Sequence, residues 1–401
     1  MGKSIVYLRN SFYILILSMA LTPLTAAQGS AAGFHAPSAH LETETYPGSS
    51  WPTATPEQMG MDTLKLEEAM EYAQNAGGSG MIIRSGVQVM SWGSITQVYD
   101  MKSASKSIGV TALGLALLDG KINLNQIAKE LHPDIGWPPD SNLATGWLDE
   151  ITILHLATQT AGFTKSGAYP ELIYRPGREW GYSDGGPSWL AETLTLAYRQ
   201  DLNTLLYERV FTPLGIPQNQ LVWGDNRYRE NFLDGIRSRE FGEMQVSVDA
   251  MARLGLLYLR GGRWEGGQQI LPESFVRSTG GQVPELMGLP EVDPHLYPNA
   301  SEHYGLLWWN NADGSMPDVP RDAFWAWGLN ESLIVVIPSL DIVATRASWD
   351  GWQDVDEDNP WTSDYRYLEP FIKPIAQAVH SPASQQQPRI WLPWVSRNTG
   401  K

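Results

Sequence analysis

Apolar residues recur along this chain with two spacings, one typical of helices and one typical of strands. Residues 57–74 and 247–260 place them every three or four positions, which predicts two helices, the second capped by Ser247. Residues 81–84 and 87–92 are short apolar runs separated by a turn, which predicts a β-hairpin. Further elements are expected as follows: helices at 152–161, 187–199 and 202–211, and strands at 333–338 and 341–347.

The most apolar helix is predicted to begin near Ser103 and to end at Gly120. Its residues are apolar on nearly every side, so we expect it to be buried in the domain. Glycine is a common residue just past the end of a helix, which supports this boundary.

Strands are therefore expected early and late in the chain, with helices between them. The fold class that follows is α+β. One lobe is an α/β sandwich around an antiparallel sheet built from both chain ends, and a mostly helical lobe, roughly residues 120–245, is inserted in it.

The N-terminal residues 1–27 have the pattern of a signal peptide. Lys3 and Arg9 precede an apolar stretch, residues 11–21, that is short for a membrane span, and cleavage is expected near Gln28. The prediction is a secreted or periplasmic protein without stable membrane insertion after cleavage; the alternative is an uncleaved membrane anchor. The remaining divisions are a linker at 28–48, a folded domain at 49–380, and a polar linker with a short apolar tail at 381–401.

Composition narrows the possible chemistry. The formal net charge of −16 disfavours nucleic acid and anionic lipid as partners. The chain has no cysteine, which excludes disulfides and thiolate catalysis. The seven histidines show no metal-ligand spacing, and His155 is expected to be a core residue; the prediction is that the protein uses no metal and no cofactor. There is no G-x-S-x-G elbow, H-E-x-x-H motif or P-loop.

One candidate nucleophile remains, in the sequence Ser103-Ala104-Ser105-Lys106. Residues three apart lie on the same helix face, so the Lys106 amine can reach the Ser103 hydroxyl. The helix N-terminus favours an oxyanion at Ser103, and burial favours the neutral amine of Lys106, which can act as a base. The alternative is an N-cap serine followed by a surface lysine.

Other segments place this motif in a known context. Tyr182-Ser183-Asp184 precedes a helix, and Trp325-Ala326-Trp327-Gly328 precedes an apolar strand. The chain resembles the serine β-lactamase-like family, which includes class C β-lactamases, D-Ala-D-Ala carboxypeptidases, family VIII esterases and 6-aminohexanoate-oligomer hydrolases. The resemblance covers roughly residues 51–350 and is carried, in order, by these segments: Ser103–Lys106, GLALLDGKINLN at 114–125, ITILHLATQTAGF at 151–163, PGREWGYSDGG at 176–186, FTPLGI at 211–216, ARLGLLYLRGGRW at 252–264, YGLLWW at 304–309 and LIVVIPSLDIVATR at 333–346.

The resemblance implies a β-lactamase/transpeptidase-like fold and a role for each matching residue. Ser103 would be the acylated nucleophile, Lys106 its proton partner, and Tyr182 the acid and base that serves the leaving group. Backbone N–H groups, one of them from Ser103, would form the oxyanion hole. The stretch around Trp325, Trp327 and Gly328 would stand where many relatives carry K-T-G and would bind or support the substrate.

Two departures from the family pattern bear on function. Asp184 occupies the third place of Y-x-N, where an ionised carboxylate can pair with Lys106 and weaken it as a base; Asp184→Asn should then lower the pH at which the rate rises. The third-motif lysine, which meets the substrate carboxylate in lactamases and carboxypeptidases, is missing. Its absence favours an ester, amide or peptide-like substrate over a β-lactam.

Three functions therefore stay open. The first is an exported esterase or amidase working through an acyl-enzyme, the second a D-Ala-D-Ala peptidase or β-lactamase, and the third a non-catalytic binding protein with the same fold. Alternatives also remain for single residues: Tyr182 and the two tryptophans can be structural core residues, and Asp184 can be a helix N-cap and nothing more.

Overall fold

A computed structural model describes residues 44–226, 236–351 and 363–379. The predicted signal peptide at 1–27, most of the linker at 28–48 and the tail at 381–401 lie outside the described residues. Within the described residues no helix is both long enough and apolar enough to span a membrane.

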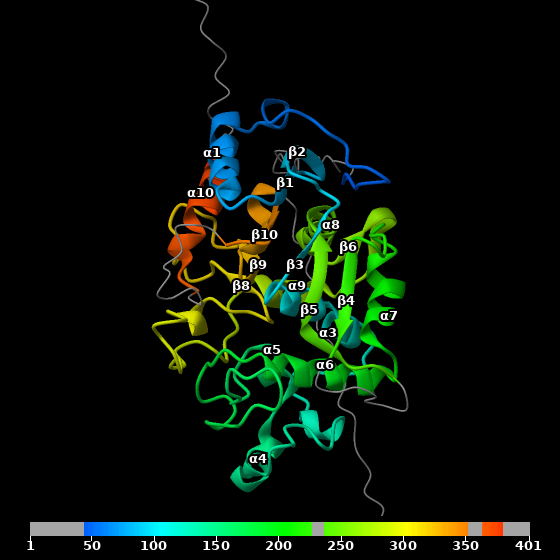
Figure 1. The fold of residues 1–401 in the computed structure, drawn as a ribbon, viewed down its shortest axis with the longest axis vertical. Coiled ribbons are helices and arrows are strands. Elements are labelled where there is room, and N and C mark those ends of the chain that lie inside the picture. Colours follow the sequence, from blue (N-terminus) through cyan, green and yellow to red (C-terminus); the bar gives the residue numbers. More distant parts are fainter. Residues whose placement is uncertain (1–43, 227–235, 352–362, 380–401) are drawn as a thin grey trace, which may run out of the picture. The chain divides into compact units, whose positions relative to one another are not determined.

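The core of the domain is a six-stranded antiparallel sheet made from both ends of the chain (Figure 1). Its strand order is β2-β1-β11-β10-β9-β8, and strand β1 pairs with β11, setting Ser79 opposite Ala347. This confirms the sheet predicted from the sequence. The strands are β1 (Ser79–Arg84), β2 (Val87–Trp92), β8 (Trp309–Asn310), β9 (Phe324–Gly328), β10 (Ser332–Ile337) and β11 (Ile342–Ala347).

Helices cover the sheet on both faces. Because successive side chains of a strand point to opposite faces, neighbouring residues of one strand contact different helices. On β11 the Thr345 hydroxyl donates to the Val248 carbonyl of α8 (Val248–Leu259), whereas Arg346 donates to the Ala73 carbonyl of α1 (Thr63–Gln74). Helix α10 (Glu369–Gln377) packs beside α1. This two-sided cover explains why β10 and β11 are buried along their whole length and why residues 333–337 of β10 form an apolar run.

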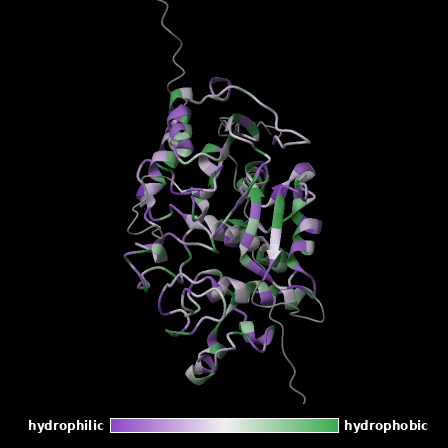
Figure 2. Ribbon diagram, in the orientation of Figure 1, coloured by the Kyte–Doolittle hydropathy of each residue, from purple (hydrophilic) through white to green (hydrophobic). Residues whose placement is uncertain are grey.

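Helix α1 shows why an amphipathic pattern identifies such a cover. Its buried residues are Leu66, Ala69 and Ala73, spaced three and four apart on one face. Figure 2 shows hydrophilic and hydrophobic residues interspersed on this helix. The Asp62 carboxylate caps its N-terminus by accepting the backbone N–H of Leu64.

A second sheet, of three strands, packs against α2 (Ala104–Gly109) and α6 (Gly185–Tyr198) through its strand β5. Its order is β3-β5-β4, with β3 at Val98–Asp100, β4 at Leu221–Asp225 and β5 at Arg239–Ser247. Strand β4 and most of β5 lie within residues 120–245, which the sequence pattern indicated as mostly helical. The remaining elements are α2 (Ala104–Gly109), α3 (Thr111–Leu118), α4 (Asp140–Thr145), α5 (Ile153–Ala157), α6 (Gly185–Tyr198), α7 (Leu202–Leu206), α9 (Glu273–Gly280), β6 (Arg263–Trp264), β7 (Gln268–Gln269), η1 (Glu57–Met59), η2 (Ala128–Glu130), η3 (Leu148–Glu150), η4 (Tyr207–Phe211), η5 (Glu265–Gly267), η6 (Ala300–Glu302), η7 (Pro338–Leu340) and η8 (Tyr365–Tyr367).

Local signals placed several boundaries correctly. The β1–β2 hairpin turns at Ser85 and Gly86, both with positive φ, and Ser247 caps α8 by accepting the Ala250 N–H. The helix predicted over 152–161 is wrong in its second half: α5 ends at Ala157, and Gln159 has a φ of 63°. The helix predicted from Ser103 to Gly120 is divided into α2 and α3 at Val110.

Candidate active site

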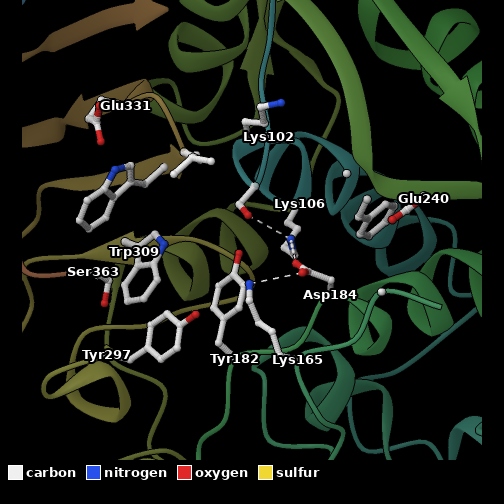
Figure 3. A pocket seen from close by; sticks show the side chains of 17 residues that line it. Lys102, Lys106, Lys165, Tyr182, Asp184, Glu240, Tyr297, Trp309, Glu331 and Ser363 are labelled. Carbon is white, nitrogen blue, oxygen red and sulfur yellow. Dashed lines mark hydrogen bonds and ion pairs between the residues drawn. The ribbon is translucent and has the colours of Figure 1, made fainter. Parts of the chain in front are cut away.

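Ser103 stands at the N-cap of α2, and its side chain is free of the capping role that serine often has. No backbone N–H of the first turn donates to it; instead the Lys106 Nζ lies 3.3 Å from its hydroxyl oxygen (Figure 3). The Lys106 side chain is only 4% exposed, so it is not the surface lysine of the alternative interpretation. The structure therefore brings the hydroxyl and the amine together as the spacing predicted.

The residue before Ser103 holds a backbone conformation that is uncommon for a side chain with a Cβ. Lys102 has a φ of 49°. The Asp100 carboxylate supports this turn by accepting the Lys102 backbone N–H at 3.0 Å and by pairing with its Nζ at 2.5 Å. Such local strain clusters at functional sites, and here it fixes the entry of the chain into α2.

Tyr182, labelled in Figure 3, comes from the segment that precedes α6 and lines the same cavity as Ser103. Burial raises the pKa of its phenol far above the usual range, the nearby Asp184 charge raises it further, and a hydrogen bond with Ser103 acts in the opposite direction. The phenol is therefore neutral and able to donate a proton at ordinary pH. Tyr297 lies parallel to it, with ring centroids 5.0 Å apart.

Asp184 is the N-cap residue of α6, but its carboxylate caps no backbone N–H of that helix. One oxygen lies 2.6 Å from the Lys106 Nζ and the other 3.3 Å from the Lys165 Nζ. Burial acts to raise the pKa of this carboxyl, but the two lysines outweigh burial and lower it below its ordinary value. Asp184 is thus an ionised partner of Lys106, and the simple N-cap interpretation does not hold.

Strand β9 closes the site opposite α2. A Cβ placed on Gly328 would lie 2.1 Å from the Met101 carbonyl oxygen and 2.8 Å from the Ala104 nitrogen, so only glycine permits this close approach. Trp327 lines the cavity beside it. Trp325 is fully buried, and its ring packs against Tyr365 with centroids 4.7 Å apart.

Ser103, Lys106, Tyr182, Asp184 and Trp327 line one cavity of about 400 Å³, a size suited to a small molecule. Part of its lining is an aromatic wall, formed by Tyr297, Trp309 and Trp327, and another part carries charged side chains, among them Lys106, Lys165 and Asp184. The lining residues are Lys102, Ser103, Lys106, Lys165, Gly167, Tyr182, Asp184, Glu240, Phe241, Gly242, Tyr297, Trp309, Trp327, Gly328, Leu329, Glu331 and Ser363.

The structure thus brings together Ser103, Lys106, Tyr182, Asp184, Trp327 and Gly328, and it places Trp325 outside the cavity, in the core. Sequence reasoning missed Lys165, Tyr297 and Trp309. Lys165 and Tyr297 stand in no motif, so no local signal could have identified them. Trp309 was contained in the segment YGLLWW, but without a role.

His155 has a structural role, as the sequence suggested. Its backbone N–H donates to the Thr152 hydroxyl, and its Nδ1 accepts the Thr152 backbone N–H, which together form a capping box for α5. In the part of the chain that the structure describes, no three acidic or histidine side chains are arranged to hold a metal ion.

Comparison with known proteins decides the family. A family model described as Beta-lactamase matches residues 65–348, which include Ser103, Tyr182 and Gly328. The chain belongs to the β-lactamase family. Membership agrees with the antiparallel sheet, with the position of Ser103 at the start of a buried helix, and with a hydrolase-like activity in general. No curated protein matches the chain.

Solved structures share the fold of this β-lactamase-family chain at low sequence identity. A β-lactamase candidate from Bacteroides dorei is 12% identical with a TM-score of 0.59, over 80% of this chain and 100% of its own. A candidate 6-aminohexanoate-dimer hydrolase from Bacillus anthracis is 15% identical with a TM-score of 0.58, over 83% of this chain and 89% of its own. Simvastatin synthase from Aspergillus terreus is 15% identical with a TM-score of 0.56, over 80% and 98%. At these identities the likeness shows the fold alone.

Proposed function

We propose that this protein is an exported serine hydrolase that forms an acyl-enzyme at Ser103 and acts on esters or amides. The observation that carries the proposal is the contact between the Ser103 hydroxyl and the buried Lys106 amine, within a cavity that also holds Tyr182. The Ser103 hydroxyl caps no backbone N–H of α2 and the Lys106 side chain is buried, so the pair does not have the N-cap and surface roles of the alternative interpretation.

The reaction follows from these positions. The Ser103 oxygen attacks the carbonyl carbon while its proton passes to the neutral amine of Lys106, and the N-terminus of α2 stabilises the oxyanion that forms. Tyr182 then donates a proton to the leaving alcohol or amine as its bond to the carbonyl carbon breaks. Water enters in place of the leaving group and hydrolyses the acyl-enzyme by the reverse proton path.

The cavity lining carries three lysines (Lys102, Lys106, Lys165) and three carboxylates (Asp184, Glu240, Glu331), and this balance favours an uncharged substrate. Lys102 pairs with Asp100, and both Lys106 and Lys165 pair with Asp184. The lysine that meets a substrate carboxylate in lactamases and peptidases has no counterpart in Ala326, Trp327 or Gly328. The aromatic wall formed by Tyr297, Trp309 and Trp327 supports an apolar acyl group instead.

The test is intact-mass detection of an acyl-enzyme over a panel of neutral esters, amides and β-lactams. We expect wild-type protein to gain the acyl mass from neutral esters or amides and Ser103→Ala to gain none. The matched control is Ser105→Ala, because Ser105 lies buried in the same helix and does not line the cavity. Full ester hydrolysis by Ser103→Ala would reject the assignment.

The Lys106–Asp184 ion pair keeps a second function in view, a binding protein that retains the fold. An ammonium held by a carboxylate at 2.6 Å has no lone pair with which to accept the Ser103 proton. A fluorophosphonate reacts readily only with an activated serine, so an unlabelled Ser103 would favour the binding protein.

Export rests on the basic residues and apolar stretch of residues 1–27. N-terminal sequencing of the mature protein recovered from outside the producing cells is expected to begin near Gln28. A protein that keeps its first residues and sediments with membranes would support the anchor instead.

A further inference from the structure

The Asp184 carboxylate bridges two lysines, and this arrangement bears on how Lys106 can work. The Lys106 Nζ lies 2.6 Å from one oxygen and the Lys165 Nζ 3.3 Å from the other. In the Y-x-N pattern of the family this place holds a neutral amide. In this protein the negative charge of Asp184 lies beside Lys106, and the positive charge of Lys165 lies beside Asp184.

A carboxylate at this distance, acting by itself, opposes the proposed reaction. It favours the charged ammonium of Lys106 over the neutral amine. Because a charged ammonium has no lone pair, it cannot accept the proton of Ser103. A neutral Lys106 next to an isolated Asp184 would also leave a largely buried carboxylate without its counter-ion.

We propose that Lys165 is a positioning residue that cancels the charge of Asp184, so that Lys106 can act on Ser103. With Lys165 present, the cluster of Lys106, Asp184 and Lys165 carries one net positive charge, as a lysine and an asparagine would. When Lys106 is neutral, Asp184 keeps a cationic partner. This inference rests on the proposed function, because it concerns the base of the acylation step.

The backbone holds Lys165 and Asp184 together. The Asp184 N–H donates to the Lys165 carbonyl at 3.3 Å, and the Gly185 N–H donates to the Ser166 carbonyl at 3.0 Å. The Ser183 hydroxyl donates to the Thr164 carbonyl at 2.7 Å. Three consecutive residues of each segment are thus joined, so the contact between the two side chains is built into the loop.

Lys165 also reaches the reacting groups. Its Nζ lies 4.3 Å from the centroid of the Tyr182 ring, and the Lys106 Nζ lies 5.2 Å from the same point. The Lys165 side chain is half exposed to the cavity, whereas that of Lys106 is 4% exposed. Burial and the nearby Lys106 charge lower the pKa of Lys165, and Asp184 opposes them.

Three phenols surround this cluster, and the charged side chains of Lys102, Glu240 and Glu331 also line the cavity. Tyr182 and Tyr297 line the cavity, and Tyr304 lies behind them. Burial raises the pKa of each phenol well above its usual range, so all three stay neutral through the pH range of the assay. Of the charged groups in the cavity, Asp184 is in ion-pair contact with Lys106, and Lys165 is in ion-pair contact with Asp184.

The test is the rate of Ser103 labelling by a fluorophosphonate as a function of pH, which needs no knowledge of the natural substrate. Lys165→Met leaves Asp184 wholly to Lys106, so the pH at which the rate rises should increase by about one unit. Asp184→Asn leaves Lys106 beside a cation, so that pH should decrease by about one unit. The double variant should return close to wild type.

Two controls make the result specific. Lys165→Arg keeps the charge and should keep the wild-type profile, which a purely structural role of the lysine would not predict. Lys129→Met removes a comparable half-exposed lysine that pairs with Asp149 at 2.7 Å, away from the cavity, and should leave the profile unmoved. Unfolding midpoints of all variants show whether each one is folded.

The outcomes separate this inference from the proposed function. If Ser103 is labelled but the profile of Lys165→Met does not move, the role of Lys165 is rejected and the serine hydrolase stands. Labelling that is lost at every pH in folded Lys165→Met, and is not restored in the double variant, would also reject it. If wild-type Ser103 is never labelled, the proposed function and this inference both fail.

Discussion

The rings of Tyr182 and Tyr297 lie parallel, 10° between their planes and 5.0 Å between their centroids. Tyr297 belongs to a segment far from Tyr182 in sequence, and it is buried against Trp180 as well, at 5.5 Å. The stack therefore fixes the ring of the proposed proton donor from behind. Tyr297, which belongs to no sequence motif, thus sets the orientation of the motif residue Tyr182.

We expect Tyr297→Leu to slow acylation about fivefold, because an aromatic pair contributes roughly 1 kcal/mol beyond its buried area, which corresponds to about that factor in rate. Tyr297→Phe keeps the ring and should stay close to wild type. Single-turnover acylation with a neutral ester measures the effect. Equal losses in the two variants would mean that the Tyr297 hydroxyl, rather than the stack, is what matters.

Gly328→Ala should destabilise the protein by about 1–3 kcal/mol and reduce acylation, because its Cβ would press on the Met101 carbonyl and part β9 from α2. Gly48→Ala is the matched control, since a Cβ there would meet nothing within 4 Å. Chemical unfolding and acylation rates measured on both variants give the comparison. Unchanged stability in Gly328→Ala would contradict the close packing of β9 on α2.

Gln159→Leu should cost about 1–3 kcal/mol of stability and slow acylation, because a buried amide is lost from the base of the site. The Gln159 side chain donates to the Ser183 carbonyl and accepts the Ser183 N–H, both at 3.0 Å, and so holds the backbone between Tyr182 and Asp184. Gln126→Leu removes an exposed side-chain hydrogen bond to Glu130, serves as the control and should change neither quantity. The readouts are denaturant midpoints and single-turnover rates.

Asp313 predicts a loss of stability in acid. Burial acts to raise the pKa of its carboxyl, but hydrogen bonds from His303 and Ser315 outweigh burial and lower it from 3.8 to about 2. Since the folded pKa lies below the unfolded one, the stabilisation is complete above pH 3.8 and is lost as the pH falls through about 2.

Asp313→Asn should therefore reduce stability by about 1 kcal/mol near neutral pH, with a difference from wild type that shrinks in acid. Unfolding free energies measured across the acidic range test this. Asp149→Asn, which removes an exposed partner of Lys129, should show no such convergence. A difference for Asp313→Asn that is independent of pH would argue against the depressed pKa.

Elements with strong local signals could be predicted from the sequence. The β1–β2 hairpin follows from two apolar runs around Ser85 and Gly86, and α8 follows from its periodicity and from Ser247 at its cap. The ordered motifs also identified Ser103, Lys106 and Tyr182, which the fold brings to one cavity. The sequence even suggested that Asp184 could pair with Lys106, and the structure shows that pair at 2.6 Å.

What could not be predicted depends on contacts between distant segments. The sequence 152–161 is a good helix by periodicity, but the bonds from Gln159 to Ser183 and its positive φ end the helix early. Lys165 looks like an ordinary loop lysine until the loop is folded against Asp184. In both cases tertiary hydrogen bonds and charges overrode local preference.

Because β1 pairs with β11, the central sheet cannot be completed until nearly the whole domain has been synthesised. Ser79 finds its partner only after Ala347 has left the ribosome, so every motif of the cavity is made before the sheet beneath it can close. Contacts so distant in sequence make folding slow, which leaves a long interval in which the unfinished chain is open to proteases. A chain that stops before β10 would carry Ser103, Lys106 and Tyr182 in order and still hold no cavity.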